Sequence, residues 1–327
     1  MTHAVTRHLT RTDTVLAFCR VERGYVRGKP VLRELSFSMQ RNEIVALLGK
    51  NGSGKTTLVH LAMGLLQPQR GSVHTFGLVP TEHAVKVKQR IGYVGEQQQF
   101  PPQLTVTDML TLHRRLFPTW DVTLERELLD RFGLGAARGK LSTLSKGQRQ
   151  QAALLCAICH RPELLLLDEP AAGLDPSTRR EFLETSIQLL NREGTAILFS
   201  SHHMGDVERL GGRVLLLTEG TIRLDRPLDV LREAHCLVVV PRHVSPDGER
   251  LRAQVGVLHL RLVGQEWHAI VDGEPLATEL RFRAALGTMD LQASALPLEE
   301  LFIEMVASPA PVAPTDARSA PDVGTVA

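Results

Sequence analysis

A glycine-rich segment from Gly49 to Thr57 constrains the fold of this chain more than any other feature. The apolar run Ile44–Leu48 before it predicts a buried strand, and Leu58–Leu66 after it has apolar residues at helical spacing. A strand, a glycine loop and a helix in this order turn backbone N–H groups toward a single anion. The spacing predicts a P-loop that binds nucleotide phosphates. The residues expected to form it are Gly49, Lys50, Asn51, Gly52, Ser53, Gly54, Lys55, Thr56 and Thr57.

Two pairs of side chains carry the expected chemistry. Lys55 would reach the β- and γ-phosphates, and the Thr56 hydroxyl would ligate Mg²⁺. Leu164–Leu167 predicts a strand buried on both faces, and Asp168 and Glu169 follow it directly. After a P-loop, Asp168 suits a second Mg²⁺ contact, and Glu169 is placed to orient or deprotonate the attacking water. A core strand with a surface Asp–Glu pair is the simpler alternative, and the P-loop upstream argues against it.

A third segment, Leu144–Gln148, precedes the leucine strand. Ser145 and the backbone N–H groups near Gly147 would cap a helix N-terminus and make a site for an anion. The segment Leu-Ser-Lys-Gly-Gln resembles the signature of the ABC-type ATPases, usually Leu-Ser-Gly-Gly-Gln. The resemblance implies that Ser145, Gly147 and Gln148 cover the γ-phosphate held by the opposite protomer. Lys146 stands where glycine is common.

The same resemblance extends to further positions. Asp175 matches the acidic member of the loop that contacts the other protomer across the dimer. His202 matches the switch histidine, which is expected to contact the γ-phosphate and hold Glu169 and water in register. Tyr25 matches the aromatic residue that stacks on adenine, an interaction worth ~1–3 kcal/mol by analogy with base–aromatic contacts.

One position departs from the family. A glutamine commonly follows the strand equivalent to Ile91–Val94, and counting from that strand reaches Glu96, with Gln97 as the alternative. A carboxylate at Glu96 could approach Mg²⁺ through water, but it would repel the γ-phosphate. Because the count from the strand reaches Glu96, this residue is the expected contact for the nucleotide and for the metal ion.

The order of elements predicts the fold class. Strands that alternate with helices predict a largely parallel sheet covered on both faces. The resemblance implies an α/β fold with a RecA-like P-loop NTPase core, an ABC-type helical subdomain and an antiparallel β subdomain. We expect a polar lead-in at 1–14, the nucleotide-binding domain at 15–235 with its helical subdomain at about 96–160, a small α+β accessory domain at 236–306, and a disordered tail at 307–327.

Composition narrows the remaining options. The net charge of +2 gives no argument for nucleic acid, and no nucleic-acid partner is expected. Apolar runs are far shorter than the ~20 residues that span a bilayer, so if the protein works at a membrane, another chain must cross it. Cys156, Cys159 and His160 resemble a metal fragment, but without a second ligand pair they are better explained as buried structural residues. The four cysteines show no disulfide framework, which favours the cytoplasm.

The functional hypothesis follows from the resemblance. It implies an ATPase that binds ATP and Mg²⁺ and dimerises head to tail. Three segments are similar to ATP-binding subunits of ABC-2-type bacterial exporters, of the YtrB-like or multidrug type. They are Phe117–Asp121, Ser200–Leu210 and Leu298–Phe302. The expected partners are separately encoded integral membrane permeases, and either an identical copy or a related ATPase, at the cytoplasmic face of the cell membrane. The alternative is a soluble ABC ATPase that acts on ribosomes or DNA.

Overall fold

The computed structural model describes residues 13–26, 28–97, 100–135, 140–190, 194–233 and 235–307. The chain divides into two compact units, Met1–Leu228 and Asp229–Ala327. Residues 1–12 of the predicted lead-in and 308–327 of the predicted tail lie outside the described residues. The predicted domain boundary at 235 falls at the first residue of strand β10 (His235–Pro241).

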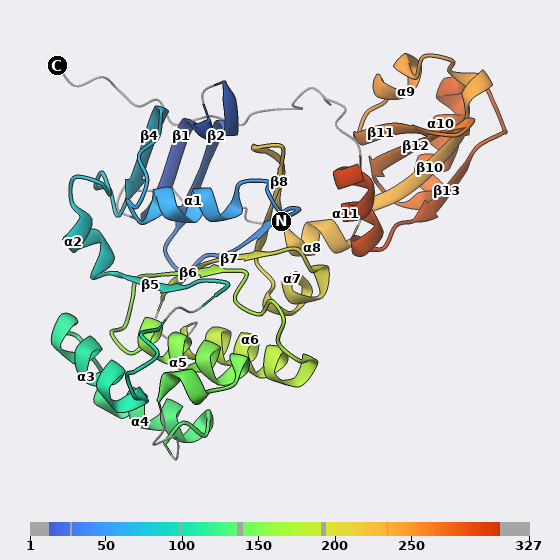
Figure 1. Ribbon diagram of the computed structural model, residues 1–327. Coiled ribbons are helices and arrows are strands. Elements are labelled where there is room, and N and C mark those ends of the chain that lie inside the picture. The colour runs from blue at the N-terminus through green and yellow to red at the C-terminus, as the bar shows by residue number, and fades with distance from the viewer. Residues whose placement is uncertain are drawn as a thin grey trace, which may run out of the picture. The chain divides into compact units, whose positions relative to one another are not determined.

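A six-stranded sheet forms the centre of the first unit, with the order β5-β6-β7-β3-β8-β9 (Figure 1). The first five strands run parallel to their neighbours, and β9 pairs antiparallel with β8. This arrangement confirms the predicted P-loop fold. The strands are β3 (Ile44–Leu48), β5 (Ile91–Val94), β6 (Leu164–Asp168), β7 (Ala196–Ser201), β8 (Arg213–Thr218) and β9 (Thr221–Pro227).

Both faces of this sheet are covered, which explains the uninterrupted leucines of β6. Leu164 and Leu166 belong to a core that includes helix α1 (Lys55–Ala62). On the other face, a Cβ added to Gly92 would lie 2.1 Å from the carbonyl oxygen of Ala157. Strand β5 therefore packs directly on helix α5. The remaining helices of this unit are α2 (Ala84–Lys88), α3 (Val106–Leu116), α4 (Val122–Arg131), α5 (Lys146–Ile158), α6 (Pro176–Leu190) and α7 (Met204–Leu210).

A second sheet of this unit is antiparallel, with the order β2-β1-β4. It consists of β1 (Thr14–Val26), β2 (Lys29–Gln40) and β4 (Arg70–Thr75). Its buried side chains, among them Leu16, Leu32 and Leu35, share one core with α1. Helix α1 consequently lies between the two sheets (Figure 1). This sheet is the antiparallel β subdomain that the resemblance implied.

Helices α3, α4 and α5 form the predicted helical subdomain. Glu125 of α4 is buried and accepts hydrogen bonds from Arg114 and from Trp120, at 2.7 Å from Trp120 Nε1.

Cys156 and Cys159 of α5 are buried too, and burial raises the pKa of both thiols. Both cysteines are therefore buried core residues, as the sequence predicted. Among the residues described, no group of three or more His, Cys, Asp or Glu side chains could hold a metal ion.

The second unit contains an antiparallel sheet with the strand order β11-β12-β10-β13. Strands β11 and β12 pair antiparallel, and Phe282, Leu286 and Trp267 contribute to a separate hydrophobic core. Within the described part of the chain, no helix is long and apolar enough to span a membrane. The other elements of this region are α8 (Leu228–Glu233), α9 (Glu249–Arg252), β11 (Val257–Val263), β12 (Glu266–Asp272), α10 (Pro275–Leu286), β13 (Gln292–Ala295) and α11 (Leu298–Ala307).

Candidate functional site

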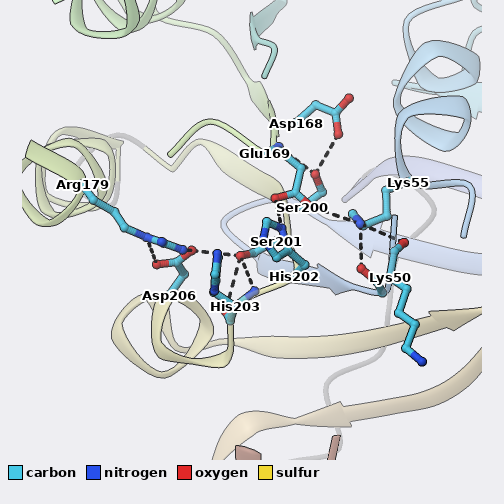
Figure 2. Close-up of polar contacts among 11 residues, drawn as sticks. Lys50, Lys55, Asp168, Glu169, Arg179, Ser200, Ser201, His202, His203 and Asp206 are labelled. Carbon is cyan, nitrogen blue, oxygen red and sulfur yellow. Dashed lines mark hydrogen bonds and ion pairs between the residues drawn. The ribbon is translucent and has the colours of Figure 1, made fainter. Parts of the chain in front are cut away.

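The topology of the parallel sheet brings three distant segments to one edge. Strand β7 lies between β6 and β3, with Asp168 opposite Ser200 and Leu48 opposite Ser201. The P-loop leaves the end of β3, and His202 follows the end of β7. Because parallel strands end at the same edge, the side chains that follow them converge there, as Figure 2 shows.

Left-handed glycines shape the P-loop. Gly52 and Gly54 have φ of 82° and 112°, a region that side-chain-bearing residues rarely adopt. A Cβ at Gly49 would lie 2.5 Å from the carbonyl oxygen of Leu217 and 2.5 Å from Ser53 Oγ. Positions 52 and 54 therefore favour glycine because of their backbone conformation, and position 49 favours it because the backbone of Leu217 approaches closely.

The P-loop lysine is held inside its own loop. Lys55 is 5% exposed, and its Nζ donates to the carbonyl oxygens of Gly49 at 2.7 Å and Lys50 at 3.2 Å. The same Nζ lies 3.0 Å from Glu169 Oε1. Lys55 therefore has two hydrogen-bond acceptors within its own loop and an ion-pair partner in Glu169.

Glu169 occupies the centre of the cluster. Its Oε1 faces Lys55, its Oε2 lies 2.7 Å from His202 Nδ1, and its backbone N–H donates to Ser200 Oγ at 2.9 Å. The backbone has φ of 48°, in the left-handed region that costs about 1–3 kcal/mol for a residue other than glycine. The surrounding bonds hold this carboxylate in a fixed orientation between a cation and an imidazole.

Asp168 is 3% exposed and faces the same edge. Ser200 Oγ donates to Asp168 Oδ1 at 2.7 Å while it accepts from Glu169, so one hydroxyl aligns both acidic residues. Burial, and then the charge of Asp168, raise the pKa of the Tyr93 phenol on β5. Sequence reasoning missed Ser200 and Tyr93, because the contacts depend on strand order rather than on spacing.

The oxygen donors at this edge suit Mg²⁺. In nucleotide sites, Mg²⁺ is commonly held by one or two protein oxygens together with water and phosphate. The Asp168 carboxylate and the exposed Thr56 hydroxyl on the first turn of α1 supply such donors. These two oxygens suit a Mg²⁺ ion that binds together with a nucleotide better than one coordinated by protein ligands alone.

Ser145 and Gln148 form a capping box at the start of α5. Ser145 N donates to Gln148 Oε1 at 2.9 Å, and Gln148 N donates to Ser145 Oγ at 3.2 Å. The N-terminal turn of α5 opens onto a hollow of about 300 Å³. This signature hollow is lined by Ser145, Lys146, Gly147, Gln148, Gln151, Gly173, Leu174, Asp175 and Thr178. It contains none of the residues of the Lys55–Glu169 cluster.

Lys146, the unusual residue of the signature, lies over the loop that precedes α6. A Cβ built on Gly173 would lie 2.5 Å from Lys146 Nζ, and Gly173 has φ of 69°. Asp175 in the same loop caps α6, and hydrogen bonds from Ser177 and then Thr178 hold the pKa of its carboxyl well below the ordinary range. The signature and this loop are therefore packed together within one chain.

The remaining predicted site residues are Tyr25 and Glu96, with Gln97 as the alternative to Glu96. Tyr25 is 61% exposed, and its hydroxyl shares a hydrogen bond of 3.1 Å with Thr57 Oγ1. Its ring is thus beside the P-loop helix, where a base could stack. Glu96 and Gln97 are both exposed after β5, and the choice between them stays a prediction. Gln150 of α5 donates to the carbonyl oxygen of Gly95 at 2.9 Å and fixes the start of that loop, a contact that sequence reasoning missed.

Comparisons of sequence agree with this geometry. The family model described as ABC transporter matches residues 32–172. YtrB of Bacillus subtilis, an ABC transporter ATP-binding protein, is 34% identical over 208 residues, 64% of this chain and 70% of that protein. Nod factor export ATP-binding protein I of Burkholderia orbicola is 32% identical over 295 residues, 88% of this chain and 95% of that protein. YdbJ of Bacillus subtilis, an uncharacterised ABC transporter ATP-binding protein, is 37% identical, and the match spans 65% of its length.

Solved structures show the same fold. An ATP-binding subunit of an ABC transporter aligns with a TM-score of 0.61 and 29% identity, over 67% of this chain and 92% of that chain. A dimeric ATP-binding cassette in a post-hydrolysis state, bound to ADP and Pi, aligns with a TM-score of 0.58 over 65% of this chain and 98% of that chain. At 24% identity, the second likeness shows the fold alone.

Proposed function

The chain belongs to the ABC transporter ATP-binding proteins, and we propose that it is the ATP-hydrolysing subunit of an exporter of the YtrB type. The observation that carries the ATPase chemistry is the cluster of Lys55, Glu169 and His202. These residues come from three segments of the sequence, and bonds of 2.7–3.0 Å link them at the edge of one sheet. Two charged groups and an imidazole at this spacing suit phosphate transfer to water.

Each residue of the cluster has a proposed role. Lys55 and the loop N–H groups bind the phosphates, while Tyr25 stacks on adenine. Glu169 orients the attacking water and accepts its proton, and His202 holds the Glu169 carboxylate and contacts the γ-phosphate. When bound, Mg²⁺ neutralises phosphate charge, and the Thr56 and Asp168 oxygens would hold it.

The separation of the signature hollow from this cluster supports a two-subunit site. The N-terminus of α5 carries Ser145, Gly147 and Gln148. The hollow at this turn contains none of the residues of the Lys55–Glu169 cluster. We propose that this turn covers ATP bound by a second ATPase subunit, identical or related. Closure driven by ATP and opening after hydrolysis then shift the population of two states that a membrane partner can use.

One consequence concerns the packing of Lys146 on Gly173. Gly173→Ala adds a Cβ that displaces the ammonium, and we expect a several-fold loss of ATPase rate. Gly133→Ala is the matched control, because Gly133 also has positive φ, 62°, but has open space around it. Both variants should lose about 1–2 kcal/mol of stability from backbone strain, measured by urea unfolding.

The double variant separates the two effects. In a Lys146→Gly background, the ATPase rate should be the same whether position 173 holds glycine or alanine. A Gly173→Ala loss of the same size with and without Lys146 would show that the contact has no part in activity.

Export is proposed from the relatives. One of them is named for Nod factor export and another for linearmycin resistance. The match to the Nod factor export protein spans 88% of this chain. These relatives do not favour the ribosome- or DNA-associated alternative. We place the protein at the cytoplasmic face of the membrane, bound to separately encoded permease chains.

The test combines activity with location. The purified protein should hydrolyse ATP, and the Lys55→Met and Glu169→Gln variants should do so far more slowly. Co-expression with the permease genes that neighbour its own should move the protein into the membrane fraction, and expression without them should not. A distribution that permease co-expression leaves unchanged would overturn the transport proposal without touching the ATPase proposal. Cosedimentation of Glu169→Gln with ribosomes or DNA would support the alternative instead.

A further inference from the structure

An ion pair outside the nucleotide cluster joins helix α6 to helix α7. Arg179 lies in the first turn of α6, where its backbone N–H donates to the carbonyl oxygen of Asp175 at 2.9 Å. Its guanidinium binds both carboxylate oxygens of Asp206 on α7, with Nε 2.7 Å from Oδ1. The two side chains are 20% and 8% exposed. A bidentate pair with so little solvent exposure fixes geometry more firmly than a surface pair.

The pair continues into the segment that carries His202. Ser201 Oγ donates to Asp206 Oδ2 at 2.9 Å, and the backbone N–H of His203 donates to Ser201 Oγ at 3.0 Å (Figure 2). The residues on both sides of His202 are therefore tied to Asp206. The His202 side chain itself is 37% exposed, so part of its ring faces solvent.

A second contact reaches the His202 ring. The His203 ring lies against it with centroids 3.9 Å apart. Burial, and then the charge of Arg179, lower the pKa of His203, so the neutral form of this ring is favoured beside the guanidinium. Arg179 and Asp206 thus support His202 through the backbone and through a neighbouring ring.

We propose that Arg179 and Asp206 are positioning residues that set the His202–Glu169 contact from the start of α6. The inference rests on the proposed ATPase function, in which that contact aligns the catalytic carboxylate. It follows that a displacement of the Asp175 loop, which immediately precedes α6, changes the rate of hydrolysis through His202. The link lies within one chain and is distinct from the contact of the signature with a second subunit.

The experiment uses the full chain and a double-mutant cycle. Asp206→Asn keeps the size of the side chain but removes the charge that Arg179 neutralises. We expect kcat for ATP hydrolysis to fall roughly ten- to hundredfold, by analogy with residues that orient metal ligands, with KM for ATP changed less than twofold. In a His202→Ala background, the same substitution should lower kcat no further, because the residue acts through His202.

A matched control is available on the same helix. Arg180 and Glu184 form an exposed ion pair at 2.7 Å, with 66% and 42% side-chain exposure. Arg180→Met should leave kcat unchanged, whereas Arg179→Met should match Asp206→Asn. Arg179→Lys, which keeps the charge but loses the bidentate geometry, should recover only part of the rate.

A spectroscopic readout decides the matter even where the His202→Ala background is too slow to assay. With ¹³C-labelled histidine, the His202 ring signal, assigned from its absence in His202→Ala, should shift in Asp206→Asn and Arg179→Met but not in Arg180→Met. An unshifted signal, or a kcat loss of equal size with and without His202, would overturn the inference. A wild-type protein that does not hydrolyse ATP would instead overturn the proposed function.

Discussion

Glu169→Gln is expected to lower the rate of ATP hydrolysis by a factor on the order of 10²–10⁴, the range in which a general base contributes. Glutamine has nearly the same shape as glutamate but cannot accept the proton of the attacking water. Its carbonyl oxygen can still face Lys55 or His202, so the cluster should keep its arrangement. Nucleotide binding should therefore survive. The measurements are kcat in steady state and the affinity for ATP by fluorescence titration.

The same variant should change the assembly. A subunit that binds ATP but hydrolyses it slowly accumulates in the closed state, so ATP should convert Glu169→Gln into a dimer detectable by light scattering. Glu219→Gln is the matched control, because Glu219 is also a glutamate with positive φ, 49°, but lies in the turn after β8. Glu219→Gln should hydrolyse ATP at the wild-type rate. Turnover by Glu169→Gln within threefold of wild type would assign the base elsewhere.

Lys55→Met is expected to weaken ATP binding about a thousandfold. An ammonium about 4 Å from a phosphate charge contributes roughly 4 kcal/mol at an effective dielectric constant of 20, and each 1.4 kcal/mol corresponds to a factor of ten. Equilibrium titration with ATP and Mg²⁺ measures the loss directly. Lys86→Met, on the exposed face of α2, is the matched control and should bind ATP as the wild type does.

Stability gives an independent check on the Lys55 contact. Lys55 and Glu169 are 6% and 11% exposed at the side chain, so removing the lysine leaves a poorly solvated carboxylate. Loss of one partner of a buried pair costs about 3–5 kcal/mol, and Lys55→Met should unfold at lower urea for that reason. The double variant Lys55→Met/Glu169→Gln should regain much of the loss. If the double variant were no more stable than Lys55→Met, the 3.0 Å contact would not be a strong ion pair.

Local sequence was sufficient for the elements that have their own signals. The P-loop needs two left-handed glycines between a strand and a helix, and Gly52 and Gly54 provide them within a few residues. Four consecutive leucines in β6 signalled a strand buried on both faces, and the structure has it buried throughout. Helix α6 begins at Pro176 for an equally local reason, because Asp175 caps the helix and proline is accepted in its first turn.

Other elements gave weaker signals or none. Strand β9 was not predicted, because it has only two apolar residues, Ile222 and Leu224, and its pairing with β8 supplies the hydrogen bonds. Ser200, Tyr93 and Gln150 are ordinary residues in the sequence. Ser200 and Gln150 make hydrogen bonds to Asp168 and to the Gly95 carbonyl oxygen, 32 and 55 residues away in the chain. Tyr93 feels the charge of Asp168, 75 residues away.

The sequence by itself determined which chemical groups this protein has: a lysine in a glycine loop, two carboxylates after a buried strand, a histidine after another, and a capped helix. The tertiary structure alone decided how they meet. Strand order places β7 between β6 and β3, so His202 lies 2.7 Å from Glu169. The neighbouring helices α6 and α7 bring Arg179 to Asp206. The physical reason is that glycine torsions and helix caps act over a few residues, whereas an ion pair depends on which strands and helices become neighbours.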